Sequence, residues 1–140
     1  MILAIINNKG GTGKTTTAVN LAAALSIKKK RTLLIDLDSQ ASASLSMGIA
    51  RSNFRPSIAD ALLDGRNMAA VIRKGSDGYI DLVTGSPELA DADLVMAKIP
   101  GRERILKGLI EPIRVNYEYI ILDCPPSLGL LTINSLTASD

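Results

Sequence analysis

Blocks of apolar residues alternate with mixed polar and apolar segments along this chain of 140 residues. Four short, mainly apolar runs, at 2–6, 32–35, 79–84 and 119–122, have the length and composition of β-strands. The first run is apolar throughout, which is typical of a parallel strand that is buried on both faces. Helical signals lie between the runs, so strands and helices alternate. This order predicts an α/β fold with a mostly parallel sheet flanked by helices.

The clearest helix is predicted from Lys14 to Ile27, where apolar residues recur with a spacing of i, i+3, i+4 and i+7. Further helices are predicted from Ser57 to Gly65, from Ser86, around 105–113 and from Leu128. Asp60 stands at the third position of the second helix, as in a capped helix start. Pro112 should kink or end the fourth. Residues 39–56, rich in Ser, Ala and Arg, have the composition of a mobile loop.

The composition excludes several classes of protein. With 46% apolar and 21% charged residues, the chain is typical of a globular domain and unlike a disordered one. Cys124 is its single cysteine and histidine is absent, which excludes an internal disulfide and a Cys/His zinc site. No apolar run approaches the roughly 18 residues of a membrane span. We therefore expect no integral membrane segment and a cytoplasmic protein, and the net charge of +2 permits an anionic partner without requiring one.

The first candidate site is the glycine-rich segment between the first strand and the first helix. The general phosphate-loop pattern is G-x-x-x-x-G-K-[ST]; Asn8 takes the place of the first glycine, and residues 13–15 match the end of the pattern. Backbone N–H groups of such a loop bind phosphate oxygens, and glycines let the backbone approach closely. Lys14 would neutralise the β- and γ-phosphates, and Thr15 would offer its hydroxyl to Mg²⁺. The segment therefore predicts a nucleoside triphosphate site.

Acidic residues follow two of the predicted strands, at the end of the sheet where ligands bind in open α/β folds. Asp36 and Asp38 lie two residues apart and so on the same side of an extended chain. One would orient the water shell of a metal ion, and the other would position an attacking water. Asp123 follows the fourth strand, as does the acidic partner of Mg²⁺ in P-loop proteins. Cys124 has no visible basic partner, so we expect a packed side chain and not a nucleophile.

Three motifs together resemble the ParA/MinD superfamily of deviant Walker A ATPases. Residues 9–17, Lys-Gly-Gly-Thr-Gly-Lys-Thr-Thr-Thr, resemble its Walker A box. Residues 36–42, Asp-Leu-Asp-Ser-Gln-Ala-Ser, resemble switch I of the ParA/Soj subfamily, where Pro often replaces Ser39. Residues 122–129, Leu-Asp-Cys-Pro-Pro-Ser-Leu-Gly, resemble the Walker B motif and switch II. The motifs follow the family order with similar spacing over nearly the whole chain.

The resemblance implies roles for individual residues. The ATP-binding residues would be Lys9, Gly10, Gly11, Thr12, Gly13, Lys14, Thr15 and Thr16. Lys9 would reach the phosphates of the second protomer in an ATP-bound homodimer, and Lys14 would act on its own ATP. Asp38 would position the hydrolytic water. Thr15 would bind Mg²⁺ directly, and Asp36 and Asp123 would act on the metal through water.

The resemblance also implies an ATPase that needs Mg²⁺ and hydrolyses ATP to ADP and phosphate. ATP-dependent dimerisation and nonspecific DNA binding would drive plasmid or chromosome partitioning on the nucleoid, and a ParB-like partner would trigger hydrolysis. Members of the family carry their adenine- and DNA-contacting residues in a C-terminal part, which residues 1–140 do not include. We therefore expect residues 1–140 to be a single P-loop ATPase domain that is incomplete at its C-terminus, because four strands are few for a doubly wound sheet.

Two alternatives stay open at this point. One is a MinD-like membrane-associated ATPase, or an ATPase that positions another cargo such as a microcompartment. The other is a P-loop enzyme, such as a kinase or a ligase, that does not dimerise.

Overall fold

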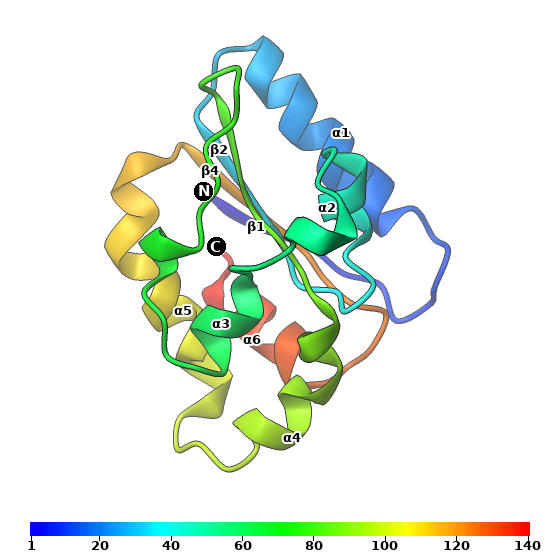
Figure 1. Ribbon diagram of the computed structural model, residues 1–140, viewed down its shortest axis with the longest axis vertical. Helices are drawn as coiled ribbons and strands as arrows, with labels where there is room; N and C mark the ends of the chain where they lie inside the picture. The colour runs from blue at the N-terminus through cyan, green and yellow to red at the C-terminus, as the bar shows by residue number, and fades with distance from the viewer.

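The computed structural model describes residues 1–140 and contains one four-stranded parallel sheet (Figure 1). The strands are β1 (Ile2–Ile5), β2 (Thr32–Asp36), β3 (Ile80–Val83) and β4 (Tyr119–Asp123), and their order is β1-β4-β2-β3. All four predicted strands are confirmed, and so is the parallel sheet. The strand that ends in Asp123 lies beside β1.

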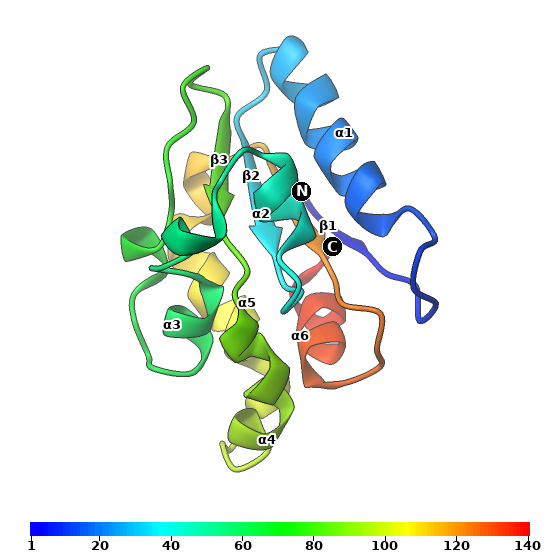
Figure 2. The ribbon, with the colours of Figure 1, turned by 45° about the vertical axis from the view of Figure 1, so that its right-hand side comes forward.

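Helices cover both faces of this sheet (Figure 2). One face carries α1 (Lys14–Ile27) and α2 (Ser42–Ser46). The other carries α3 (Ile58–Leu62), α4 (Ala92–Met96), α5 (Ile105–Ile110) and α6 (Leu130–Ala138). Alternate residues of β2 point to opposite faces of the sheet. Leu34 packs with α1 and α2, and Leu33 and Ile35 pack into the larger core on the opposite face. Two buried faces explain why β1 and the interiors of β2 and β4 are uninterrupted apolar runs, whereas the edge strand β3 includes Asp81.

The prediction of a mobile loop over 39–56 is wrong. This segment contains α2 and the short 3₁₀ helix η1 (Arg51–Asn53), and Ala41, Ala43 and Ser44 are fully buried. Small Ala and Ser side chains give little hydrophobic contrast, so the sequence pattern does not reveal that this helix packs against the sheet.

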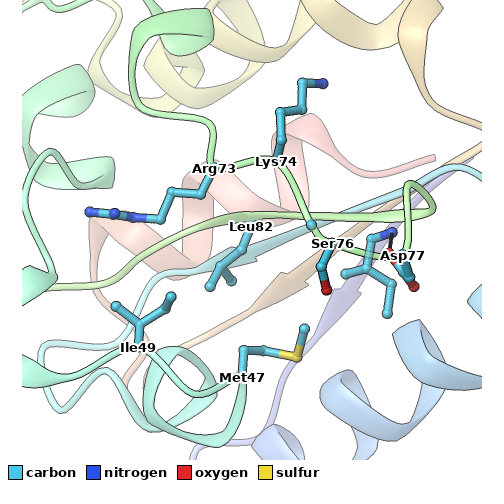
Figure 3. Close-up of a pocket in the computed structure, with 9 residues that line it drawn as sticks. Met47, Ile49, Arg73, Lys74, Ser76, Asp77 and Leu82 are labelled. Carbon is cyan, nitrogen blue, oxygen red and sulfur yellow. Dashed lines mark hydrogen bonds between the residues drawn. The ribbon is translucent and has the colours of Figure 1, made fainter.

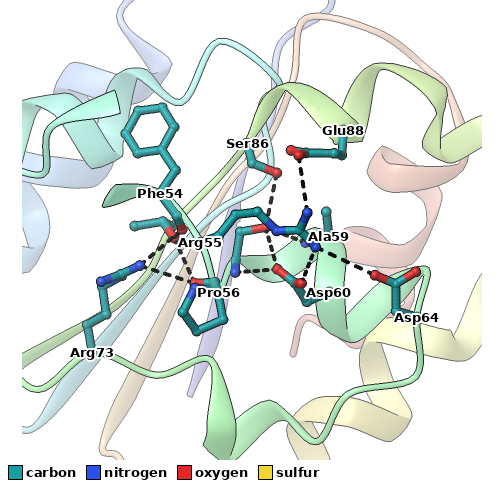
Figure 4. A network of polar contacts seen from close by, with 11 residues as sticks. Phe54, Arg55, Pro56, Ala59, Asp60, Asp64, Arg73, Ser86 and Glu88 are labelled. Atoms are coloured by element: carbon teal, nitrogen blue, oxygen red, sulfur yellow. Dashed lines mark hydrogen bonds and ion pairs between the residues drawn. The ribbon is translucent and has the colours of Figure 1, made fainter. Parts of the chain in front are cut away.

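The helix predicted after Ser57 is confirmed, and it begins with a capping box. The Ser57 hydroxyl accepts a hydrogen bond from the Ala59 N–H (3.2 Å), and Asp60 Oδ2 accepts one from the Ser57 N–H (2.7 Å). The helix ends at Leu62, before the predicted Gly65. Asp60 also pairs with Arg55 at 2.5 Å, and Arg55 reaches further acidic side chains around it (Figure 4). Asp60 therefore joins the helix start to the preceding segment.

The remaining predicted helices are confirmed with shifted boundaries. Ser86 precedes a 3₁₀ helix, η3 (Pro87–Asp91), which leads into α4. After α5, Pro112 lies in the 3₁₀ helix η5 (Glu111–Asn116), so the α-helix ends where proline was expected to interrupt it. The last helix, α6, starts at Leu130 and not at Leu128, because residues 124–129 form the turn between β4 and α6.

Candidate nucleotide site

The glycine-rich segment connects β1 to the start of α1 at the carboxyl edge of the sheet. Gly11 and Gly13 have φ of +69° and +87°, the left-handed region that favours glycine. Gly13 occupies the N-cap position of α1, and no side chain caps this 14-residue helix. Its first turn also contains no acidic residue. Free backbone N–H groups and the positive end of the helix dipole therefore lie at the loop, a combination that binds phosphate.

The ammonium group of Lys14 lies over this loop. Its Nζ donates a hydrogen bond to the Lys9 carbonyl at 3.1 Å, and the Thr12 hydroxyl donates to the same carbonyl at 3.2 Å. The Lys9 side chain is different, because it is exposed and makes no hydrogen bond or ion pair. The loop thus holds one cation inside and leaves another pointing to solvent.

Thr15 and Asp123 meet across the site. The Thr15 hydroxyl donates to Asp123 Oδ2 at 2.7 Å, which joins the first turn of α1 to the end of β4. Asp123 Oδ1 is buried without any hydrogen-bond partner. Burial raises the pKa of Asp123 to about 6, although the Thr15 hydrogen bond opposes this rise. A hydroxyl and an unpartnered carboxylate oxygen are hard donors that suit Mg²⁺, directly or through its water.

Asp36 lies next to Asp123, because the two residues are in register on neighbouring parallel strands. Its Oδ2 accepts hydrogen bonds from the N–H (2.8 Å) and hydroxyl (2.7 Å) of Ser44, and its Oδ1 accepts one from the Asp38 N–H (3.2 Å). The Ser44 hydroxyl in turn accepts from the Gly85 N–H at 3.0 Å. Burial raises the pKa of Asp36, and the hydrogen bonds from Ser44 counteract it. Asp36 therefore also anchors α2 to the sheet.

Asp38 borders an open cleft of about 510 Å³ together with the phosphate loop. Its Oδ1 accepts a hydrogen bond from the Gln40 N–H at 2.9 Å. The other lining residues are 10–16, Gln40, Ser42, Ser46 and Pro126. The cleft thus lies between the loop, the segment after β2 and the turn after β4. A separate cavity of about 360 Å³ at the sheet edge, with Met47, Ile49 and Leu82 in its wall, shares no residue with this cleft (Figure 3).

Comparison with known proteins identifies the family of this chain. Residues 1–140 match a family described as AAA domain. The chain is 45% identical over 139 residues to the sporulation initiation inhibitor protein Soj of Bacillus subtilis. It is 43% identical over 139 residues to the chromosome partitioning protein ParA of Myxococcus xanthus. The chain belongs to this AAA domain family, in its ParA/Soj subfamily.

The likeness extends to three dimensions. The crystal structure of cobyrinic acid a,c-diamide synthase from Mycobacterium smegmatis, with bound ATP analogue and magnesium, is 36% identical and superposes with a TM-score of 0.93. Each of these comparisons covers 99% of the present chain, but only 55% of Soj, 49% of ParA and 56% of the synthase. The chain therefore spans about half the length of the relatives it matches. None of its helices combines the length and apolarity needed to cross a membrane.

This ParA/Soj-type domain brings together most of the residues that the sequence indicated. Residues 10–16 and Asp38 border the cleft, and Asp123 contacts Thr15 behind it. The Lys9 side chain is not part of the cleft wall. Cys124 is buried, and burial raises the pKa of its thiol to about 11, as fits a packed side chain.

Sequence reasoning missed the residues that support Asp36. Ser44 is the main one, and it lies in the segment that was predicted to be a loop. Gly85 is the other: a Cβ there would come within 2.6 Å of the Asp38 carbonyl oxygen and 3.0 Å of Asp36 Oδ1. Neither residue carries a motif, and only the close approach of β3 to the segment after β2 reveals them.

Proposed function

We propose that this chain is the nucleotide-binding part of a ParA-like ATPase that hydrolyses ATP to ADP and phosphate with Mg²⁺. The observation that carries the proposal is the junction at the start of α1. There a phosphate loop lies over an uncapped helix N-terminus, and Thr15 is bonded to a buried carboxylate with a free oxygen. The ATP analogue and magnesium bound to the M. smegmatis synthase support the choice of ligand.

The residues divide the work between phosphate binding, metal binding and water positioning. Residues 9–16 would bind the phosphates, with Lys14 as the cation of the loop. Thr15 would bind Mg²⁺, and Asp123 and Asp36 would hold its water. When bound, Mg²⁺ supplies a positive charge that stabilises the phosphates during transfer. Asp38, which borders the cleft, would orient the attacking water.

Lys9 is the residue that would turn nucleotide binding into assembly. It is exposed and unpaired, so it is free to contact the phosphates of a second copy of the chain across the cleft. A homodimer closed in this way by ATP would bind DNA nonspecifically, through residues outside this chain. A ParB-like activator would trigger hydrolysis and release. The similarity to Soj and ParA supports this role in plasmid or chromosome partitioning, in the cytoplasm and on the nucleoid.

A DNA-retention experiment tests the partitioning role. Full-length protein would be passed over immobilised duplex DNA with ATP and Mg²⁺, with ADP, or without nucleotide, at increasing salt. We expect the protein to be retained only in the presence of ATP and Mg²⁺. This retention should decline steeply with salt, because contacts to DNA phosphates release counterions. Retention that is absent or independent of nucleotide would contradict the partitioning role. ATP-dependent retention on anionic vesicles, with none on DNA, would instead support the MinD-like alternative.

A further inference from the structure

A carboxylate on α4 caps the first turn of α6. Asp93 Oδ1 accepts a hydrogen bond from the Leu130 N–H at 2.9 Å, and Leu130 is the first residue of α6. The residue at the N-cap position of that helix, Gly129, has no side chain and supplies no cap of its own. Figures 1 and 2 show α4 beside the start of α6. Asp93 therefore provides from another element what a Ser or Asp at the N-cap would provide locally.

Gly129 shows that the same contact is tight. Its backbone, with φ of −75° and ψ of −172°, is extended and open to any residue. A Cβ on Gly129 would nevertheless overlap Asp93 Oδ2 and come within 3.0 Å of Oδ1. A side chain at position 129 would therefore have to displace the Asp93 carboxylate, although the backbone conformation there accepts any residue.

The turn that Asp93 holds also forms a wall of the nucleotide cleft. Pro126 in this turn borders the cleft, and the Ser127 carbonyl accepts a hydrogen bond from the Thr132 hydroxyl at 2.6 Å. The turn and the start of α6 are therefore one connected unit. A cavity of about 340 Å³ separates Asp93 from the cleft, and Asp38 and Pro126 border both. Asp93 lies on the far side of this cavity and does not border the nucleotide cleft.

We propose that Asp93 is a positioning residue for ATP hydrolysis, which it promotes by fixing the β4–α6 turn, residues 124–129, against the cleft. The inference rests on the proposed ATPase function. Loss of the contact frees the turn, and with it the wall opposite the phosphate loop, while the loop itself is unchanged. The rate of the hydrolytic step therefore falls, and nucleotide binding changes little.

Single-turnover ATP hydrolysis and ATP affinity, measured on a set of variants, test this inference. Asp93→Ala should lower the hydrolysis rate about tenfold with ATP affinity within twofold of wild type. Asp93→Asn keeps an oxygen acceptor and should restore most of the rate. Asp91→Ala is the matched control, because Asp91 is exposed on the same segment and accepts no hydrogen bond from another element. It should behave as wild type.

A double substitution tests the steric half of the inference. Gly129→Ala alone should reduce the rate at least as much as Asp93→Ala, because its Cβ displaces the carboxylate. In the Asp93→Ala background the same change should have almost no further effect. Equal effects of Gly129→Ala in both backgrounds would overturn the inference, since the glycine would then be needed for another reason.

Hydrogen exchange separates a displaced turn from a misfolded protein. Asp93→Ala should speed amide exchange in a peptide covering 125–132 and leave α1 unchanged, and Asp91→Ala should leave both unchanged. Wild-type rates in Asp93→Ala, or faster exchange throughout the chain, would overturn the inference and leave the ATPase function intact. If wild-type protein hydrolyses no ATP, the proposed function is wrong, and the inference about hydrolysis falls with it.

Discussion

Removal of one buried hydroxyl, in Ser44→Ala, should cost about 3 kcal/mol of the free energy of unfolding. The Ser44 hydroxyl donates to Asp36 Oδ2 at 2.7 Å and accepts from the Gly85 N–H at 3.0 Å. A hydrogen bond to a charged group contributes roughly 1.5–3 kcal/mol, and a buried N–H without an acceptor costs roughly 1–3 kcal/mol. Ser44 is fully buried, so water does not easily replace either bond. The two ranges sum to about 2.5–6 kcal/mol. We expect about 3 kcal/mol, in the lower part of that sum, because Asp36 Oδ2 keeps its hydrogen bond from the Ser44 N–H.

Urea unfolding at pH 7, followed by circular dichroism, measures this effect. The midpoint should fall with an unchanged slope, because the surface exposed on unfolding stays the same. Ser46→Ala is the matched control on the same helix: its hydroxyl is exposed and donates only to the Ser42 carbonyl, so the change should stay below about 0.5 kcal/mol. A Ser44→Ala effect no larger than that of the control would refute the role of this bond in joining α2 to the sheet.

Three further predictions concern pH, the loop and the metal. Burial opposes ionisation of Asp60, but hydrogen bonds from Arg55 and Ser57 outweigh it and hold the pKa of Asp60 below its usual range. The stabilisation from ionised Asp60 is therefore present above its pKa in the unfolded chain and is lost as pH falls through its pKa in the folded protein. Asp60→Asn should flatten the acid side of a plot of the free energy of unfolding against pH. A variant with the curvature of wild type would argue against this role of Asp60. Lys14→Ala should weaken ATP binding by about 10–100-fold in a fluorescence titration, because a charged hydrogen bond to the phosphates is lost. The control Lys28→Ala should bind ATP as wild type does. Equal ATP affinities of the two variants would exclude Lys14 as the phosphate ligand. Chelation with EDTA should abolish hydrolysis, and excess Mg²⁺ should restore it; hydrolysis that persists in EDTA would contradict the Mg²⁺ requirement.

The sequence predicts the strands and the phosphate loop well for a physical reason. A parallel strand that is buried on both faces must be apolar throughout, and a loop that surrounds phosphate must place glycines and a lysine at fixed positions. The prediction for the segment after β2 fails because its helix is rich in Ala and Ser. The burial of this helix depends on the hydrogen bonds between Ser44 and Asp36, which no periodic pattern encodes.

Contacts between distant elements are the second limit. The link from Asp93 to Leu130 spans 37 residues, and Gly129 carries no sign that a carboxylate from α4 lies against it. Likewise, the sequence predicts only that Thr15 and Asp123 act on the same metal ion. The structure adds a direct hydrogen bond between these two side chains, which are 108 residues apart. Such pairs depend on how the helices pack, and only the folded chain brings them together.

Nucleotide-dependent self-association tests the central claim most directly, because it asks whether Lys9 acts on a second copy. Full-length protein would be measured by sedimentation velocity with ATP and Mg²⁺, as wild type, Lys9→Ala and the control Lys28→Ala, with ATP binding checked in parallel. We expect a dimer for wild type and for Lys28→Ala, and a monomer that still binds ATP for Lys9→Ala. A Lys9→Ala protein that dimerises like wild type would contradict the account and favour a P-loop enzyme that works without a partner copy.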